Sequence, residues 1–231
     1  MQQKSTKRAR PKISVIIPTL NEEGNIRQVI RRISSVLSGM SYEILVVDGY
    51  SEDRTARIAA DMGARVLYDN KGKGSALIKG FKEARGSILV SIDADLSNEP
   101  KEMKLLIDSI DIGYDICMGS RFITGGGTQD MPLVRRIGNR FFVILVNLFF
   151  NANYSDLCYG YRSFRKDKIK LLALKQNRFA IETEISIMAA KRHLKVIEIP
   201  SVEKKRDSGQ GKLRTVSDGW SILCTILENL R

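Results

Sequence analysis

Short apolar runs alternate with amphipathic stretches along about the first 100 residues of the chain. Each run is brief and mostly apolar, which predicts a buried strand. The predicted strands cover 12–18, 42–47, 65–68 and 87–92. Between them, apolar residues recur every three or four positions, which predicts helices over 22–37 and 51–61. Gly72, Gly74 and Ser75 predict a flexible turn that leads into a further helix ending at about Ala84. This alternation is typical of the α/β class, with a mostly parallel twisted sheet flanked by helices.

The remainder of the chain is predicted to be richer in helix. Strands are expected at 116–119 and 196–200, and helices at 131–150, 166–174, 183–192 and 215–230. No low-complexity linker divides the sequence, and 231 residues are enough for one domain. We therefore expect a basic flexible tail over 1–12 and a single domain over 13–231.

Two carboxylates, one residue apart, follow the predicted strand 87–92. Asp93 and Asp95 come where the apolar run ends, and open α/β sheets bind ligands at the carboxyl ends of their strands. Close carboxylates repel each other unless a cation neutralises them, and Mg²⁺ often binds one or two carboxylates together with substrate phosphates. The pair therefore predicts a site for a divalent metal, Mg²⁺ or Mn²⁺, and a phosphorylated ligand.

Three further polar features fall at strand ends of the same predicted sheet. They are the segment 18–22, Asp48 and Arg121. Because the carboxyl ends of parallel strands meet at one edge, we expect these residues to share a cleft with Asp93 and Asp95. There Asp48 can accept hydrogen bonds from a base or a ribose, although an aspartate at such a position is also typical of a turn.

The chain is strongly basic, with a net charge of +12 and a pI near 9.7. This balance favours an acidic partner, which can be nucleic acid, an anionic membrane or a phosphorylated substrate. No recognised nucleic-acid-binding motif is present. We therefore expect no nucleic-acid partner, and a basic nucleic-acid-binding module is kept only as the non-enzyme alternative.

The sequence carries no secretory or membrane-spanning signal. Its basic N-terminal segment is followed by no long apolar core, and no stretch reaches the roughly 18–20 apolar residues of a spanning helix. The three cysteines predict buried thiols in a reducing compartment, without a disulfide framework or zinc spacing. His193, the single histidine, is expected at the surface end of a helix.

Five spaced motifs occur in order along the chain. They are SVIIPTLNEE at 14–23, ILVVD at 44–48, GKG at 72–74, DAD at 93–95 and GSR at 119–121. In this order they resemble glycosyltransferase family 2, and within it the polyprenyl-phosphate sugar synthases of the dolichol-phosphate mannose synthase type. The resemblance extends from Ile13 to about Trp220. It implies a GT-A fold, a nucleoside-diphosphate sugar donor and inversion at the anomeric carbon.

The resemblance also implies which residues form the site. The nucleotide and metal would be held by Asp93, Ala94 and Asp95, within a nucleotide-binding half over 13–121. The nucleotide pocket would further be lined by Pro18, Leu20, Glu22, Val47 and Asp48. An acceptor and lid half over 122–231 would contain a basic loop that closes over the phosphates. The implied catalytic residues are Asp95, Arg121, Arg206 and Lys212.

The sequence departs from the family pattern in two places. The family usually has two consecutive aspartates after the second strand, and here the second is Gly49. This leaves the base of the donor, UDP or GDP, undetermined. Cys158 and Tyr159 stand where the family often has Thr and Ser, so Arg162 is the expected basic contributor there. The acceptor phosphate is therefore expected to contact Arg121, Arg162, Arg206 and Lys212.

Together these features predict transfer of a hexose to a polyprenyl or dolichyl phosphate, with GDP-mannose as the first choice of donor. The alternatives are UDP-glucose or UDP-N-acetylglucosamine as donor, and a saccharide hydroxyl as acceptor. A phosphate acceptor is already ionised near neutral pH and needs no strong base. A hydroxyl acceptor needs a base to remove its proton, and Glu182 and Glu184 are then the candidate bases.

A lipid acceptor requires contact with a membrane surface. Arg135, Arg136 and Arg140 precede the apolar run 141–146, which predicts either a helix in the lipid interface or a buried core helix. Basic residues of the tail add attraction to anionic lipid, on the order of 1 kcal/mol each near the surface. We expect peripheral attachment at the cytoplasmic face of the membrane, directly or through a membrane protein partner.

Overall fold

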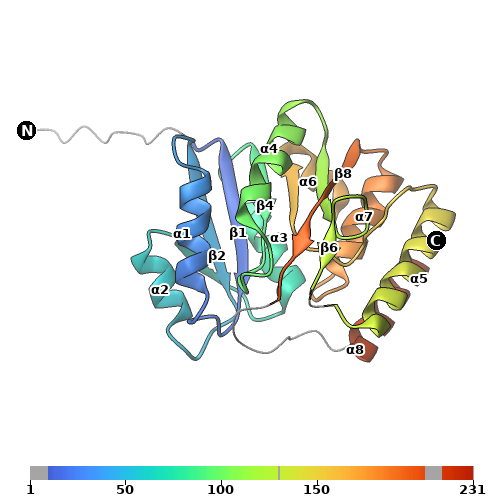
Figure 1. The fold of residues 1–231 in the computed structure, drawn as a ribbon, viewed down its shortest axis with the longest axis horizontal. Helices are drawn as coiled ribbons and strands as arrows, with labels where there is room; N and C mark the ends of the chain where they lie inside the picture. Colours follow the sequence, from blue (N-terminus) through green and yellow to red (C-terminus); the bar gives the residue numbers. More distant parts are fainter. Residues whose placement is uncertain (1–9, 130, 206–214, 231) are drawn as a thin grey trace, which may run out of the picture.

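The computed structural model describes residues 10–129, 131–205 and 215–230. Its main strands are β1 (Ile13–Thr19), β2 (Tyr42–Asp48), β3 (Arg65–Tyr68), β4 (Ile88–Ser91), β5 (Ile116–Ser120), β7 (Arg162–Arg165) and β8 (Val196–Pro200). They form one sheet in the order β3-β2-β1-β4-β7-β5-β8 (Figure 1). Its neighbouring strands are parallel except at β7, which runs antiparallel to β4 and β5. A second, parallel pair is formed by β6 (Gly127–Thr128) and β9 (Val202–Glu203).

Helices cover both faces of the main sheet. Those on one face are α1 (Ile26–Val36), α2 (Thr55–Asp61) and α4 (Met103–Asp111), which follows the short 3-10 helix η1 (Pro100–Glu102). Those on the other face are α3 (Lys73–Glu83), α5 (Leu133–Phe150), α6 (Lys166–Leu172), α7 (Ile181–Lys191) and α8 (Thr215–Glu228). The prediction of a mostly parallel sheet flanked by helices is confirmed.

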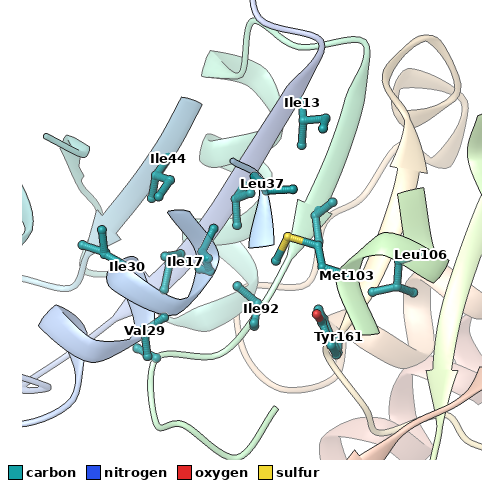
Figure 2. Packing of buried hydrophobic residues seen from close by; sticks show 14 of the residues in the cluster. Ile13, Ile17, Val29, Ile30, Leu37, Ile44, Ile92, Met103, Leu106 and Tyr161 are labelled. Atoms are coloured by element: carbon teal, nitrogen blue, oxygen red, sulfur yellow. The ribbon is translucent and has the colours of Figure 1, made fainter. Parts of the chain in front are cut away.

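The central strand β1 shows why its sequence is a nearly continuous apolar run. Ile13, Val15 and Ile17 enter the core beneath α1 and α4, part of which Figure 2 shows. Ile16 points to the other face and packs in the core beneath α3 and α7. Because both faces are covered, both sets of alternating positions are mostly apolar, as is usual in parallel sheets, and the buried hydroxyl of Ser14 donates to Glu43 at 2.7 Å.

Several elements were not predicted, among them β7, α4, η1 and the short pair β6 and β9, and the first two helices begin later than expected. The strand β7 has the sequence RSFR and the helix α4 lies at 103–111, where no element was predicted. The first helix begins at Ile26, because Asn21 has a φ of 51° and its side chain accepts the N–H of Glu52 at 2.9 Å. Since β7 lies between β4 and β5, the predicted halves 13–121 and 122–231 share one sheet.

The close packing of α3 on β1 depends on a glycine. A Cβ atom at Gly80 would overlap Cγ2 of Ile16. We expect Gly80→Ala to lower the free energy of unfolding by about 1–3 kcal/mol, because the buried contact is overpacked. Gly138 on α5 has open space around it and is the matched control. Gly138→Ala should raise the free energy of unfolding by about 0.5–1 kcal/mol. Urea denaturation measures both variants, and equal stabilities of the two would contradict the close packing of α3 on β1.

Candidate active site

The candidate site lies at the carboxyl edge of the sheet, next to β1 and β4. The chain continues from β1 to β2 on one side of β1 and places β4 on the other, so the strand order reverses there. Ligands of open α/β sheets bind at such a switch point. Leu20 follows β1 and Asp93 follows β4 shortly after its end. The predicted segments 18–22 and 93–95 are therefore brought to one edge.

The two aspartates of the DAD motif differ in their surroundings. Asp95 is buried, and its Oδ1 accepts hydrogen bonds from the N–H of Ser97 at 3.0 Å and its hydroxyl at 2.6 Å. The side chain of Asp93 is 28% exposed, and its Oδ1 lies 2.8 Å from Nζ of Lys73. Burial raises the pKa of Asp93, Lys73 opposes this, and the charge of Asp95 adds to the rise. Asp93 is thus a carboxylate whose ionised form requires nearby positive charge.

Lys73 joins this site, although no role was predicted for it from the GKG motif. It begins α3, and its Nζ lies 2.9 Å from Oε1 of Glu182 as well as near Asp93. Burial alone would lower the pKa of Lys73, but the two carboxylates raise it well above its usual value. The ammonium group therefore remains charged and compensates both acids.

The GKG motif explains how Lys73 reaches these carboxylates. Gly72 has a φ of +120°, a conformation that favours glycine, and a Cβ there would lie 2.6 Å from the carbonyl oxygen of Asn177. A Cβ at Gly74 would overlap the carbonyl oxygen of Gln176. The two glycines let the start of α3 approach the backbone ahead of α7. A lysine between two such glycines was the signal in the sequence that could have identified the residue.

Glu182 has an oxygen that no other described residue engages. Its side chain is 5% exposed, and Oε2 is buried without a hydrogen-bond partner among the described residues. Gly160 packs against this cluster, since a Cβ there would lie 2.9 Å from Nζ of Lys73 and 3.3 Å from Oε1 of Glu182. Buried carboxylate oxygens are normally hydrogen-bonded. An unpartnered one beside Asp93 is suited to a polar ligand group.

The second candidate base, Glu184, lies elsewhere. Its carboxylate accepts the N–H of Lys175 at 3.0 Å and the N–H of Gln176 at 2.9 Å. Burial raises its pKa, which these hydrogen bonds oppose. Of the two glutamates, only Glu182 joins the acidic pair.

Two predicted lining residues are covered. Val47 and Asp48 are fully buried. Oδ1 of Asp48 accepts the hydroxyls of Thr19 at 3.1 Å and Ser51 at 2.6 Å, while Oδ2 accepts the N–H of Ser51 at 2.7 Å. In this structure Asp48 holds the turn after β2 and Val47 packs in the core, and ligand contact by these two residues stays a prediction.

The other predicted lining residues line the edge to different degrees. Leu20 is 39% exposed and Pro18 is half-buried. Glu22 is only 8% exposed and accepts the side-chain amide of Asn25 at 2.8 Å. Ala94 is buried between the two aspartates. Leu20 is the member of this group with the most accessible surface.

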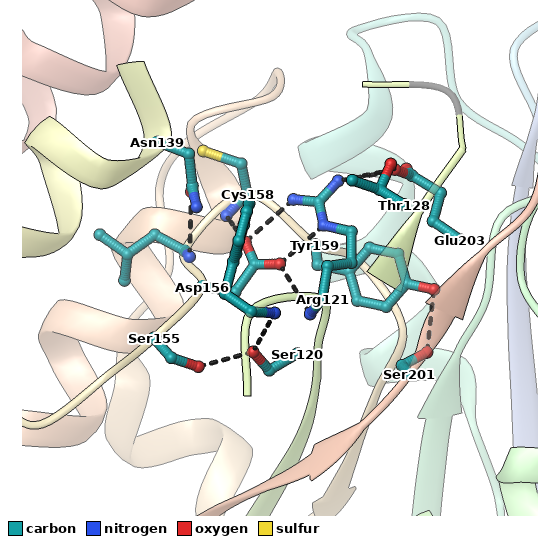
Figure 3. Close-up of polar contacts among 12 residues, drawn as sticks. Ser120, Arg121, Thr128, Asn139, Ser155, Asp156, Cys158, Tyr159, Ser201 and Glu203 are labelled. Atoms are coloured by element: carbon teal, nitrogen blue, oxygen red, sulfur yellow. Dashed lines mark hydrogen bonds and ion pairs between the residues drawn. The ribbon is translucent and has the colours of Figure 1, made fainter. Parts of the chain in front are cut away.

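Arg121 is buried in a network of carboxylates (Figure 3). Its Nε and Nη2 donate to Asp156 at 2.7 and 2.9 Å, and its Nη1 donates to Glu203 at 3.1 Å. The guanidinium also lies 4.7 Å from the ring centre of Tyr159. Burial alone would lower the pKa of Arg121, but Asp156 and then Glu203 raise it. Asp156 and Glu203 thus compensate the charge of Arg121. Through Glu203, Arg121 also links the end of β5 to the strand β9, just before Lys204.

Arg162, which was predicted to contact the acceptor phosphate, is buried inside the fold. It is 1% exposed, and its guanidinium donates to the main-chain oxygens of Leu157, Tyr159 and Glu182 at 2.8–2.9 Å. Burial lowers its pKa. Arg162 is thus a structural residue that fixes the backbone around Gly160, and a phosphate cannot reach it in this arrangement.

Several predicted residues have other outcomes. Arg206 and Lys212 lie outside the described residues. Cys117 is buried, whereas Cys158 and Cys224 are half-buried, and all three are free thiols. His193 is exposed just after α7, which confirms its expected place.

The donor set at this edge fits a hard divalent cation that also binds a ligand. Among the described residues, no group of three or more His, Cys, Asp or Glu side chains is arranged to hold a metal. Asp93 and Asp95 supply oxygen ligands one residue apart, and Asp93 already binds the positive charge of Lys73. Mg²⁺ and Mn²⁺ commonly take one or two carboxylates and complete their shell with water and phosphate oxygens.

A mostly parallel α/β sheet with paired carboxylates at its switch point is typical of proteins that bind nucleotides or related phosphorylated ligands. The chain belongs to one family within that class. Residues 14–172 match the family described as Glycosyl transferase family 2.

Curated relatives agree with this membership. The chain is 36% identical over 211 residues to a dolichol-phosphate mannosyltransferase of Pyrococcus furiosus, covering 88% of this chain and 59% of the relative. It is 33% identical to a low-salt glycan biosynthesis hexosyltransferase of Haloferax volcanii, covering 95% of this chain and 54% of the relative. A polyprenol monophosphomannose synthase of Mycolicibacterium smegmatis is 29% identical over 90% of this chain and 83% of its own. The chain therefore spans little more than half the length of the first two relatives.

Solved structures establish the fold. Glucosyl-3-phosphoglycerate synthase from Mycobacterium tuberculosis, crystallised with Mn²⁺, UDP and glucosyl-3-phosphoglycerate, superposes with a TM-score of 0.76. The sequence identity is 22%, and the match covers 95% of this chain and 80% of that chain. The expected GT-A fold is confirmed.

The Arg121 network predicts a large effect on stability. Asp156→Ala would leave a buried guanidinium with Glu203 as its remaining carboxylate partner, so we expect a loss of about 3–5 kcal/mol. The control is Asp167→Ala, because Asp167 is 63% exposed and pairs with Arg165 at the surface. Its loss should stay below about 1 kcal/mol. Chemical denaturation of both variants measures this, and an Asp156→Ala protein as stable as the control would contradict a structural role for Arg121.

Proposed function

We propose that this chain transfers a hexose from a nucleoside-diphosphate sugar to a polyprenyl phosphate, with inversion at the anomeric carbon. The observation that carries the proposal is the cluster of Asp93, Asp95, Lys73 and Glu182 at the switch point of the sheet. The names of two relatives, a dolichol-phosphate mannosyltransferase and a polyprenol monophosphomannose synthase, support a lipid phosphate as acceptor and mannose as the sugar. GDP-mannose is therefore the first donor to test.

The reaction is a direct displacement at the anomeric carbon. An oxygen of the lipid phosphate forms a bond to that carbon while the bond to the nucleoside diphosphate breaks, and the electron pair leaves with the diphosphate. Because the acceptor phosphate is ionised near neutral pH, no proton has to be removed by a strong base. A divalent metal held by Asp93 and Asp95 would supply positive charge to the departing diphosphate.

Lys73 and Glu182 complete the donor side of the proposed site. The Lys73 side chain is 16% exposed and remains charged, so it can exchange part of its ion pair with Asp93 for a phosphate oxygen. The unpartnered Oε2 of Glu182 can accept a hydrogen bond from a sugar hydroxyl. Both interactions would orient the sugar for displacement.

The acceptor phosphate requires positive charge from a different segment. The charges of Arg121 and Arg162 are already engaged inside the fold. Lys204 lies nearer the surface, with a side chain that is 46% exposed and paired with Glu99 at 2.6 Å. We assign the acceptor phosphate to the basic segment that begins at Lys204 and continues through Arg206 and Lys212, whose roles remain predictions.

The route to a lipid substrate is proposed to be a surface formed by two helices. No described helix is long and apolar enough to cross a membrane. α5 packs against α8 (Figure 1), and α5 buries Val143 and Val146. Its opposite side carries an exposed apolar stripe at helical spacing: Leu133, Val134, Ile137, Phe141, Ile144 and Leu148. α8 adds a stripe of Val216, Trp220 and Leu227.

Charge next to this stripe favours an anionic lipid surface. Arg136 and Arg140 are exposed on α5, and at helical spacing they fall along one side of the stripe. Apolar side chains flanked by arginines are typical of helices that lie in the lipid interface. We propose that this face docks on the cytoplasmic leaflet, whose negative surface potential attracts such residues. The predicted helix thus has one side buried in the core and one side exposed.

The transferase activity is tested by a donor panel. Purified protein and Mn²⁺ receive labelled GDP-mannose, UDP-glucose or UDP-N-acetylglucosamine with polyprenyl phosphate in detergent, and label extracted with lipid is counted. One donor should label the lipid, and EDTA should abolish the signal. Asp95→Ala should lower the rate by about 10²–10³, the usual loss when charge stabilisation is removed from a transition state.

Asp111→Ala is the control, because Asp111 is exposed and pairs with Lys12 away from the site. If label enters an added saccharide but not the lipid, the acceptor is a saccharide hydroxyl rather than a lipid phosphate. Glu182 is then the candidate base. No transfer from any donor, together with salt-dependent oligonucleotide binding, would favour the nucleic-acid-binding alternative.

Membrane docking is tested by flotation with anionic liposomes. The variant Phe141→Ser/Leu148→Ser/Trp220→Ser should bind at least tenfold more weakly, since each large apolar side chain contributes about 1.5–3 kcal/mol when fully buried. Leu105→Ser/Ile112→Ser is the control, because these residues are also exposed but belong to the α4 region. Unchanged binding by the triple variant would contradict docking through α5 and α8 and leave a membrane protein partner as the route.

A further inference from the structure

An exposed pair of tyrosines lies at the ends of β2 and β3. Tyr50 is 61% exposed and Tyr68 is 46% exposed. Their ring centres are 5.3 Å apart and the ring planes are inclined by 39°. Neither ring belongs to the buried cores beneath the helices. Burial in the core therefore does not account for two adjacent aromatic side chains at this edge.

The backbone of Tyr50 is unusual for a bulky residue. Its φ is 61°, in the left-handed region where large side chains are uncommon. Hydrogen bonds on both sides impose this conformation: Gly49 donates its N–H to the oxygen of Thr19 at 2.8 Å, and Ser51 donates its N–H to Asp48 at 2.7 Å. Strained conformations that the surroundings enforce are concentrated at ligand sites.

The position of the pair relative to the acidic cluster matches an extended ligand. β3 and β4 are three strand steps apart in the order β3-β2-β1-β4, which is about 14 Å across the edge of the sheet. A ligand with its phosphates at Asp93 that extends along this edge passes Leu20 and reaches Tyr50 and Tyr68. Tyr50 and Tyr68 thus lie at one end of this sheet edge, and Asp93, the proposed phosphate site, lies at the other.

We propose that Tyr50 and Tyr68 form the stacking surface for the nucleobase of the donor, an inference that rests on the proposed function. Asp48 is buried with both oxygens engaged, and Gly49 has no side chain. At these two positions no accessible carboxylate reads the edge of a base. Stacking instead accepts any base, because every base has a π-face. The surface therefore strengthens binding of uracil and guanine nucleotides alike.

The test compares nucleoside diphosphates with a ligand that has no base. Calorimetry in Mn²⁺ measures the affinities of GDP, UDP and inorganic pyrophosphate. Tyr50→Gly and Tyr68→Ala should each weaken GDP and UDP about tenfold, within the usual range for loss of one base–aromatic contact. Pyrophosphate binding should not change. Tyr50→Phe and Tyr68→Phe keep the rings and should bind as the wild type does.

The controls separate stacking from a folding defect. Tyr114→Ala removes a half-buried tyrosine at the amino end of β5, away from the site, and should leave all affinities unchanged. Tyr50→Gly should not lower the melting temperature, because glycine readily adopts a φ of 61°. His193→Gly is the matched control for Tyr50→Gly, because it also places a glycine at a residue of positive φ, 51°, but far from the site.

The outcomes distinguish this inference from the function on which it rests. The stacking surface is contradicted if the wild type binds GDP and UDP no more tightly than pyrophosphate. It is also contradicted if Tyr50→Gly and Tyr68→Ala keep full affinity for GDP and UDP. Either result leaves the proposed function standing. Failure of the wild type to bind any nucleoside diphosphate overturns the proposed function and the inference with it.

Discussion

The ion pairs of Lys73 with Asp93 and Glu182 are the interactions on which the site depends. Three carboxylates converge near the end of β4, and buried charges are costly unless they are paired. Much of the local backbone serves this pairing. The glycines beside Lys73 allow α3 to approach the loop before α7, and Gly160 leaves room for the cluster just before β7. A bound metal and diphosphate could replace part of these ion pairs, because the ammonium group of Lys73 can then contact a phosphate oxygen. The same ion pairs therefore stabilise the fold and place charged groups for the proposed reaction.

Positive charge is used in two different ways in this molecule. Arg121 and Arg162 are buried, and their guanidinium groups join segments that are distant in sequence. Arg136 and Arg140 remain exposed beside an apolar stripe on α5. The first kind builds the edge of the sheet around the site. The second is available to an anionic surface.

The parts of the fold that sequence predicted are those set by local pattern. β1, β2 and β4 are largely buried, so their sequences are mostly apolar, and Asp93 could be placed because it follows such a strand. β7 was missed because its Arg162 and Ser163 are polar residues that are buried by partners elsewhere in the chain. For the same reason, Arg121 and Arg162 were predicted as phosphate ligands. Their charge is visible in the sequence, whereas Asp156, Glu203 and the main-chain oxygens that bind them are brought close only by the fold.

We propose that the carboxyl end of β4 holds a divalent metal together with a diphosphate. Anomalous diffraction near the manganese edge, from crystals grown with Mn²⁺ and GDP, tests this placement. We expect one strong peak within coordinating distance of Asp93 and Asp95, about 2.0–2.6 Å from their oxygens, with phosphate density alongside Lys73. Bound nucleotide with no anomalous peak at these carboxylates, or a peak at another edge of the sheet, would contradict it.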